Sequence, residues 1–164
     1  MKPGTGVAWL MLAFSSGVPA QQGTFTMASM TPETALVAAR AALEQCRRDG
    51  YQVAVAVVDR SGVVQVLLRD RYAGPHTVEV ASNKAWTAAS FRTPTAVIAL
   101  ETQPGKPMSG LRSLGKVLAA GGGQAIEGAG AVLGAIGVSG APNGDADDTC
   151  AKAGIKSIAD AIEF

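Results

Sequence analysis

The chain has 164 residues, of which 48% are hydrophobic and 16% are charged, and its formal net charge is +1. This length suits one domain that can bury a core without structural metal ions, and the apolar content excludes a disordered chain. The balanced charge, without any run of lysine and arginine, argues against a nucleic-acid-binding protein.

The N-terminal residues have the pattern of a secretory signal peptide. Lys2 precedes a short apolar run at 7–14 (VAWLMLAF), and the segment 15–20 (SSGVPA) ends in small residues that suit cleavage after Ala20. The apolar run is far too short to span a membrane. The pattern therefore predicts an exported protein, periplasmic or secreted.

This interpretation divides the chain into a signal peptide at 1–20, a flexible lead-in at 21–30 and one folded domain at 31–164. The alternative is a disordered leader followed by an internal start at Met27 or Met30, which would leave the protein in the cytosol. A single basic residue is few for the start of a signal peptide, so the sequence leaves both interpretations open.

The domain begins with a predicted helix at 31–48. Thr31 can cap its N-terminus, Pro32 suits the first turn, and Gly50 can end it in a left-handed conformation. Apolar side chains recur at spacings of three and four along one stripe, namely Leu36, Ala39, Leu43 and Cys46.

The stretch 52–69 (QVAVAVVDRSGVVQVLLR) predicts two β-strands around a tight turn, and the remaining elements can be interpreted as cover for this sheet. The first strand, 52–58, is apolar without alternation, so we expect both of its faces to be buried between helices. Residues 59–62 supply the turn, and 63–68 form the second strand.

A loop at 70–76 leads into a second predicted helix at 77–91, and a third, short helix covers 95–100. The second helix carries a face of small side chains: Ala81, Ala85, Ala88 and Ala89. Such a face lets another backbone approach closely, either the sheet or a neighbouring subunit.

The C-terminal half predicts further strands around 117–119, at 124–127 and at 131–138, followed by one helix at 145–164. We interpret three acidic residues at the start of this helix as groups that cap it and interact with its dipole, namely Asp145, Asp147 and Asp148. The order of elements is not a βαβ alternation. It predicts an α+β domain with an antiparallel sheet between helical layers.

The chain has two cysteines, Cys46 and Cys150, each on a predicted helix. In an exported chain an even number of cysteines suggests a disulfide, which requires Cα atoms within roughly 7 Å. The alternative is two buried free thiols.

Few residues can carry chemistry. There is one histidine and no close pair of cysteines, so the sequence has no zinc motif, and no phosphate-binding loop is present. His76 could ligate a metal or a haem iron or transfer protons, or it could be a residue at a helix start without further role. A general base at His76, with Asp59 or Glu79 nearby in sequence, lacks an identifiable nucleophile.

Basic side chains offer contacts for an anionic ligand. Lys84 lies two turns after His76 and could pair with such a ligand, or it could lie across the surface with its charge in water. Three arginines flank the predicted hairpin and could meet carboxylates or haem propionates, or be solvated: Arg60, Arg69 and Arg71.

Three stretches together resemble the GlcG/HbpS-like family of haem-binding and haem-degrading domains. They are 55–69 (VAVVDRSGVVQVLLR), 73–91 (AGPHTVEVASNKAWTAASF) and 132–154 (VLGAIGVSGAPNGDADDTCAKAG). The runs at Lys84–Ala88 and Gly137–Gly140 are specific in combination. The resemblance covers nearly all of the chain after the predicted signal peptide.

The resemblance implies a profilin-like three-layer α/β/α sandwich with a five-stranded antiparallel sheet. In that arrangement the first and last helices can lie together, which favours a Cys46–Cys150 disulfide. It also implies an exported homo-oligomer that binds haem, with His76 as the iron ligand and Lys84 in the ligand site. The alternative is an oligomeric module without catalytic activity that binds another small metabolite or a partner protein.

Overall fold

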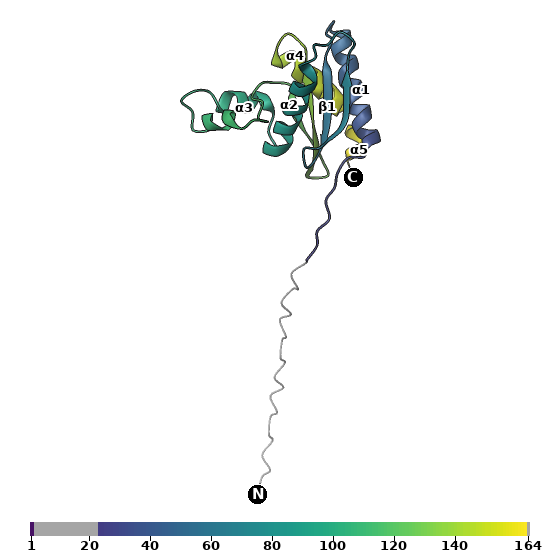
Figure 1. Cartoon of the computed structure of the whole chain (residues 1–164). Coiled ribbons are helices and arrows are strands. Elements are labelled where there is room, and N and C mark those ends of the chain that lie inside the picture. Colours follow the sequence, from purple (N-terminus) through teal and green to yellow (C-terminus); the bar gives the residue numbers. More distant parts are fainter. Residues whose placement is uncertain (2–22, 164) are drawn as a thin grey trace.

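The computed structural model describes residue 1 and residues 23–163, and Figure 1 shows its elements in chain order. The predicted signal peptide, apart from Met1, lies outside the described residues. The elements are α1 (Pro32–Arg48), β1 (Ala54–Asp59), β2 (Val64–Arg69), α2 (Thr77–Phe91), α3 (Thr95–Glu101), the 3-10 helix η1 (Ser109–Ser113), β3 (Gly123–Gly128), β4 (Ala131–Ser139), α4 (Gly144–Lys156) and α5 (Ala159–Ile162). Within the described part, no helix has the length and apolar character needed to cross a membrane.

The sheet is antiparallel and has four strands in the order β2-β1-β4-β3, so the prediction of five strands is wrong. The missing strand is the one expected around 117–119. Its backbone is held by local and side-chain groups instead: the Val117 N–H donates to the Leu114 carbonyl, and the Leu118 N–H donates to Thr87 Oγ1 at 3.0 Å. This segment therefore lies against α2 and does not join the sheet.

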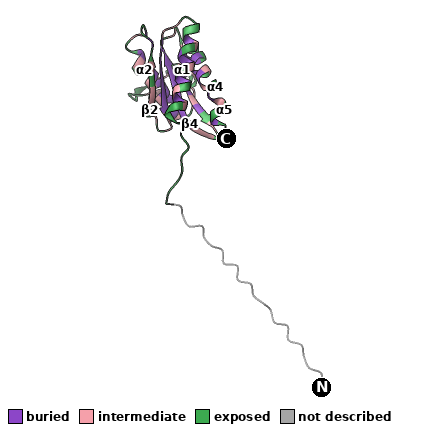
Figure 2. Ribbon diagram, turned by 90° about the vertical axis from the view of Figure 1, so that its right-hand side faces the viewer, coloured by how far each residue is buried: buried purple, intermediate pink, exposed green. Residues whose placement is uncertain are grey.

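Helices cover both faces of the sheet and create two apolar layers. One layer lies under α1 and α4 and includes Val55, Val57 and Ile136, while the other lies under α2 and includes Ala54 and Ala56. Alternate residues of β1 thus enter opposite layers, and the first five residues of the strand are buried, as its unbroken apolar run predicts. Figure 2 shows this buried interior between the exposed outer faces of the helices.

Close approach between α2 and β4 depends on glycine. A Cβ added at Gly137 would lie 2.1 Å from the Ala81 carbonyl oxygen and 2.6 Å from the Ala85 nitrogen. Both contacts are with backbone atoms of α2, which cannot rotate aside as a flexible side chain could. Position 137 therefore has no room for a Cβ. The small-residue face of α2 therefore packs on the sheet.

The opposite layer is joined covalently. Cys46 on α1 and Cys150 on α4 form a disulfide, with a Cα–Cα distance of 5.5 Å, and both residues are fully buried. The predicted single helix at 145–164 is instead two helices, because the chain bends between Lys156 and Ala159. The Ser157 hydroxyl donates to the Gly154 carbonyl at 2.7 Å, and buried Ile158 packs in the core at this bend.

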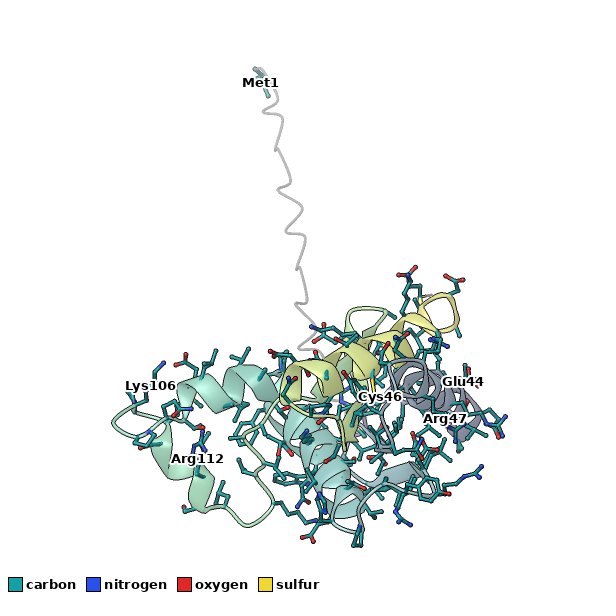
Figure 3. The ribbon with its side chains drawn as sticks, turned by 90° about the horizontal axis from the view of Figure 1, so that it is seen from above. Met1, Glu44, Cys46, Arg47, Lys106 and Arg112 are labelled. Atoms are coloured by element: carbon teal, nitrogen blue, oxygen red, sulfur yellow. A yellow bond between two sulfur atoms is a disulfide. The ribbon has the colours of Figure 1, made fainter. Side chains whose placement is uncertain are left out.

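The segment 93–120 projects from the sandwich as an arm that carries α3 and η1, as Figure 1 shows at its left side. In the view of Figure 3 the arm's Lys106 and Arg112 lie well away from Cys46. Four apolar side chains of the arm are exposed: Val97, Leu100, Met108 and Leu114.

Candidate functional site

His76 lies directly before the first residue of α2 and is exposed. Its backbone is helical, with φ −65° and ψ −25°, and its side chain makes no capping hydrogen bond with the helix. The imidazole lies over Gly74, where an added Cβ would be 2.6 Å from His76 Cε1. Glycine at position 74 therefore leaves room for the imidazole. The ring nitrogens of His76 make no capping hydrogen bond to the helix.

The loop that carries His76 is fixed at several points. Arg69 Nε donates to the Ala73 carbonyl at 2.9 Å, and Thr77 Oγ1 donates to the Gly74 carbonyl at 2.6 Å. Asp70 is buried and accepts a hydrogen bond from Arg47 Nε at 2.9 Å. This hydrogen bond raises the pKa of Arg47 above its ordinary value. The loop thus presents His76 from an anchored backbone.

Lys84 is almost fully buried, so the interpretation that it lies across the surface is wrong. Its Nζ donates to Asp147 Oδ2 at 2.7 Å and to the Val138 carbonyl at 3.0 Å. The ammonium is thus held inside the protein between α2, α4 and the end of β4. The structure does not bring Lys84 and His76 together at one accessible surface.

Asp147 and Asp148 are buried and accept hydrogen bonds from other groups of the protein, so our interpretation of them as helix caps is wrong. The cap is Asn143, whose Oδ1 accepts from the Ala146 N–H at 2.9 Å. Asp147 also accepts from the Ala141 N–H at 3.0 Å. Asp148 Oδ1 accepts from the Gly122 N–H at 2.6 Å and from Gln124 Nε2 at 2.7 Å.

Burial raises the pKa of Asp147 above the ordinary value for an aspartate, although the hydrogen bond and the charge of Lys84 act in the opposite direction. The sequence contains one signal for this pair. Lys84 lies among the small apolar residues of α2 that face the sheet, and a lysine in such a place needs a carboxylate partner.

A separate cavity of about 500 Å³ lies around the tip of the β3–β4 hairpin, at the end of the sheet opposite the pair of Lys84 and Asp147. Its charged lining residues are Arg60, Arg92, Glu127 and Glu163, and residues 128–132 complete it. Arg92 ends α2 in a left-handed conformation with φ 51°. His76 does not line this cavity.

Among the residues that the structure describes, no group of three or more histidine, cysteine or acidic side chains could hold a metal ion.

A model of the HbpS-like family, described as "Haem degrading protein HbpS-like", matches residues 30–156. Among solved structures, a double mutant of HbpS from Streptomyces reticuli is 38% identical, with a TM-score of 0.78 over 88% of this chain and 97% of that one. A structure described as a PduOC:Heme complex is 32% identical, with a TM-score of 0.75 over 79% of this chain and 95% of that one.

Curated relatives that match are longer proteins. The corrinoid adenosyltransferase PduO of Salmonella typhimurium is 38% identical over 103 residues, which are 62% of this chain and 31% of that protein. The enzyme of the same name from Citrobacter freundii is 37% identical over a stretch of the same length. The matched stretch thus spans about a third of the curated relatives.

Proposed function

The chain belongs to the HbpS-like family of haem degrading proteins, and we propose that it is an exported haem-binding protein with His76 as the ligand of the iron. The observation that carries this proposal is the position of His76, an exposed imidazole on an anchored loop that does not cap its helix. The heme complex of the relative PduOC supports haem as the molecule that is bound.

The residues around His76 fit a haem at the protein surface. In the loop that carries His76, Tyr72 is exposed and offers an aromatic contact for a macrocycle, and Arg71 is exposed and could pair with a propionate. Bound haem would supply an iron centre that reacts with peroxide, which is one route to haem degradation. The chain's own contribution is the imidazole that ligates the iron and the loop that fixes its position.

Lys84 has an indirect role in this proposal. Its pairing with Asp147 joins α2 to α4, so it supports the helix that begins next to His76. We assign it no contact with haem, because both of its hydrogen bonds are to protein groups in the interior.

The proposed location is the periplasm or the exterior of the cell, with residues 1–20 removed and residues 21–30 as a lead-in. The buried disulfide between Cys46 and Cys150 supports this, because disulfides form and persist in oxidising compartments. We further propose that the protein forms a homo-oligomer.

A haem titration of the purified protein, followed by Soret absorbance, tests the ligand and the residue together. We expect a saturable, shifted Soret band that is lost in His76→Ala and kept in Glu79→Gln, a change at an exposed position on the first turn of the same helix. A band unchanged in His76→Ala would contradict the assignment of the iron ligand. The absence of any saturable band would contradict haem binding.

The cavity at the β3–β4 hairpin favours a second candidate function, the binding of another small metabolite without chemistry. It is lined by two arginines and two glutamates and by small residues of the hairpin, and the described residues include no ion pair within it. A lining of both signs suits a zwitterion, whose carboxylate would meet guanidinium groups and whose ammonium would meet carboxylates.

Calorimetric titration with L-alanine tests this second function. We expect saturable binding that is lost in Arg92→Gly, which removes the guanidinium and places at a left-handed position the residue that prefers it. Arg40→Gln, at an exposed position on α1, is the matched control. Binding that is equal in all three proteins, or no binding, would contradict the role of the cavity.

A further inference from the structure

Arg69 is the last residue of β2 and comes directly before the loop that carries His76. It pairs with Ala54 of β1, and cross-strand partners share a face of the sheet. Ala54 belongs to the apolar layer that lies under α2. The Arg69 side chain therefore starts on the face over which the chain returns from the loop into α2.

The guanidinium of Arg69 is committed to a single backbone group. Its Nε and Nη2 atoms both donate to the Ala73 carbonyl, at 2.9 Å and 2.6 Å, and among the described residues no other hydrogen bond ends on this oxygen. The Ala73 side chain is buried. Because the guanidinium fork is planar and rigid, it fixes the direction of the carbonyl as well as its distance.

The imidazole of His76 rests on the residue that follows this carbonyl. The peptide unit that Arg69 holds joins Ala73 to Gly74, and such a unit is planar. A Cβ added at Gly74 would lie 2.6 Å from His76 Cε1, 2.9 Å from Nδ1 and 3.7 Å from Nε2. The orientation of this peptide unit thus limits where the imidazole can lie, and Nε2 is the ring nitrogen farther from the loop backbone.

The other anchors of the loop lie on either side of this peptide unit. Arg47 binds the Asp70 carboxylate at the start of the loop, and the Thr77 hydroxyl donates to the Gly74 carbonyl at its end. Between them, one side chain of the described residues donates to the loop backbone, that of Arg69. Removal of Arg69 would therefore free the middle of the loop and leave both of its ends attached.

We propose that Arg69 is a positioning residue for the iron ligand: by holding the Ala73 carbonyl it orients the His76 imidazole, with Nε2 toward the iron. The proposal rests on the haem-binding function proposed above and names a residue that acts on haem through His76. Groups that orient a metal ligand commonly change metal affinity by about 10–100-fold when they are removed.

Haem and iron-free protoporphyrin together separate positioning from a direct contact, because both carry the propionates and only haem has an iron for His76. We expect Arg69→Leu to weaken haem binding, measured by Soret absorbance, by about 10–100-fold. Protoporphyrin binding, measured by fluorescence, is expected to be unchanged. Arg71→Leu, at an exposed arginine of the same loop, is the matched control and is expected to change the affinity for both ligands by the same factor.

A double-variant cycle tests whether Arg69 acts through His76. In the His76→Ala background, Arg69→Leu is expected to cause no further loss of haem affinity, since no imidazole is left to orient. Arg69→Lys keeps the charge but replaces the fork by one ammonium, so its haem affinity is expected to lie between those of the parent and Arg69→Leu. Far-ultraviolet circular dichroism establishes that the variants are folded.

The imidazole also reports its own position without haem. His76 is the one histidine of the chain, so protein purified without a histidine tag gives a single Cε1–H resonance in proton magnetic resonance spectra. Arg69→Leu is expected to move this resonance toward that of free histidine, and Arg71→Leu is expected to leave it in place.

Three results would overturn the inference: an unchanged imidazole resonance in Arg69→Leu, equal losses of haem and protoporphyrin affinity in that variant, or an undiminished loss of haem affinity from Arg69→Leu when His76 is already absent. If the parent binds no haem, the haem proposal fails by its own titration. The imidazole resonance then still decides whether Arg69 positions His76.

Discussion

At the scale of single residues, the ion pair of Lys84 and Asp147 is the most consequential contact outside the proposed haem site. Both groups are nearly excluded from water, and three elements meet at them. Removing one partner of such a pair is more destabilising than replacing both, because the remaining group is left buried without compensation.

We predict that the two partners respond differently to removal. Asp147→Asn keeps an oxygen that can accept a hydrogen bond from Lys84 but removes the negative charge, so the ammonium stays buried without a counter-ion. The variant is expected to lower the free energy of unfolding by about 3–5 kcal/mol. Lys84→Met leaves a carboxyl that can take up a proton, so its effect depends on pH. Urea unfolding of both variants and of the double variant measures this, and equal losses in the two single variants at every pH would contradict it.

The direction of the pH dependence in Lys84→Met follows from the pKa of Asp147. Burial already raises that pKa, and removal of Lys84 takes away the two strongest influences that lower it. A carboxyl with a raised pKa in the folded state binds more protons there than in the unfolded chain. The variant is therefore expected to be closest to the parent in stability at pH values below the ordinary aspartate pKa, and to lose stability as the pH rises through the raised value.

Sequence reasoning at this scale identified the one histidine and the two cysteines, because each is rare in the chain. It misassigned Asp147 and Asp148, because a carboxylate near a helix start has the same local pattern whether it faces solvent or the interior. The distinction depends on Lys84, 63 residues earlier in the chain, which no local pattern connects to it.

At the scale of elements, the contact between α2 and the centre of the sheet sets the geometry of the layer. Position 137 touches the backbone of α2, whereas Gly115, in the arm, has no atom within 4 Å of an added Cβ. These two glycines therefore form a matched pair for testing how closely the helix must approach.

We predict that Gly137→Ala destabilises the protein by an amount at or above the upper end of roughly 1–3 kcal/mol, the usual cost of overpacking a core. The added methyl would displace α2 as a unit, because its neighbours are main-chain atoms. Gly115→Ala is expected to change stability by less than about 0.5 kcal/mol, as at other open surface sites. Thermal unfolding of the three proteins compares them, and similar melting temperatures for both variants would contradict the prediction.

The order of the elements and most of their boundaries could be predicted from sequence. The second helix was predicted at 77–91 and begins and ends at those residues, because its start and its small-residue face are local features. The strand predicted around 117–119 is absent, since whether a short apolar segment joins a sheet depends on which edge is open beside it. There the Thr87 hydroxyl takes the Leu118 N–H.

At the scale of the whole molecule, the disulfide between α1 and α4 joins positions 104 residues apart and restricts the unfolded chain. In the chain-entropy model a closure of this length contributes roughly 4–5 kcal/mol. We predict a loss of this order in a variant with Cys46→Ala and Cys150→Ala, measured by urea unfolding under oxidising conditions. The parent under a reducing agent is the comparison, and unchanged stability in the variant would contradict the entropic account.

The same disulfide decides what a single cut of the backbone can release. The backbone from Cys46 to Cys150 and the bond between the two sulfurs make a closed covalent circuit that contains every strand of the sheet, α2 and the whole projecting arm. A protease that cuts once in the exposed segment 103–108 would open this circuit but release nothing, since both new ends stay attached through α1 and α4. This exposed segment is thus also one where a single cut leaves the molecule in one piece.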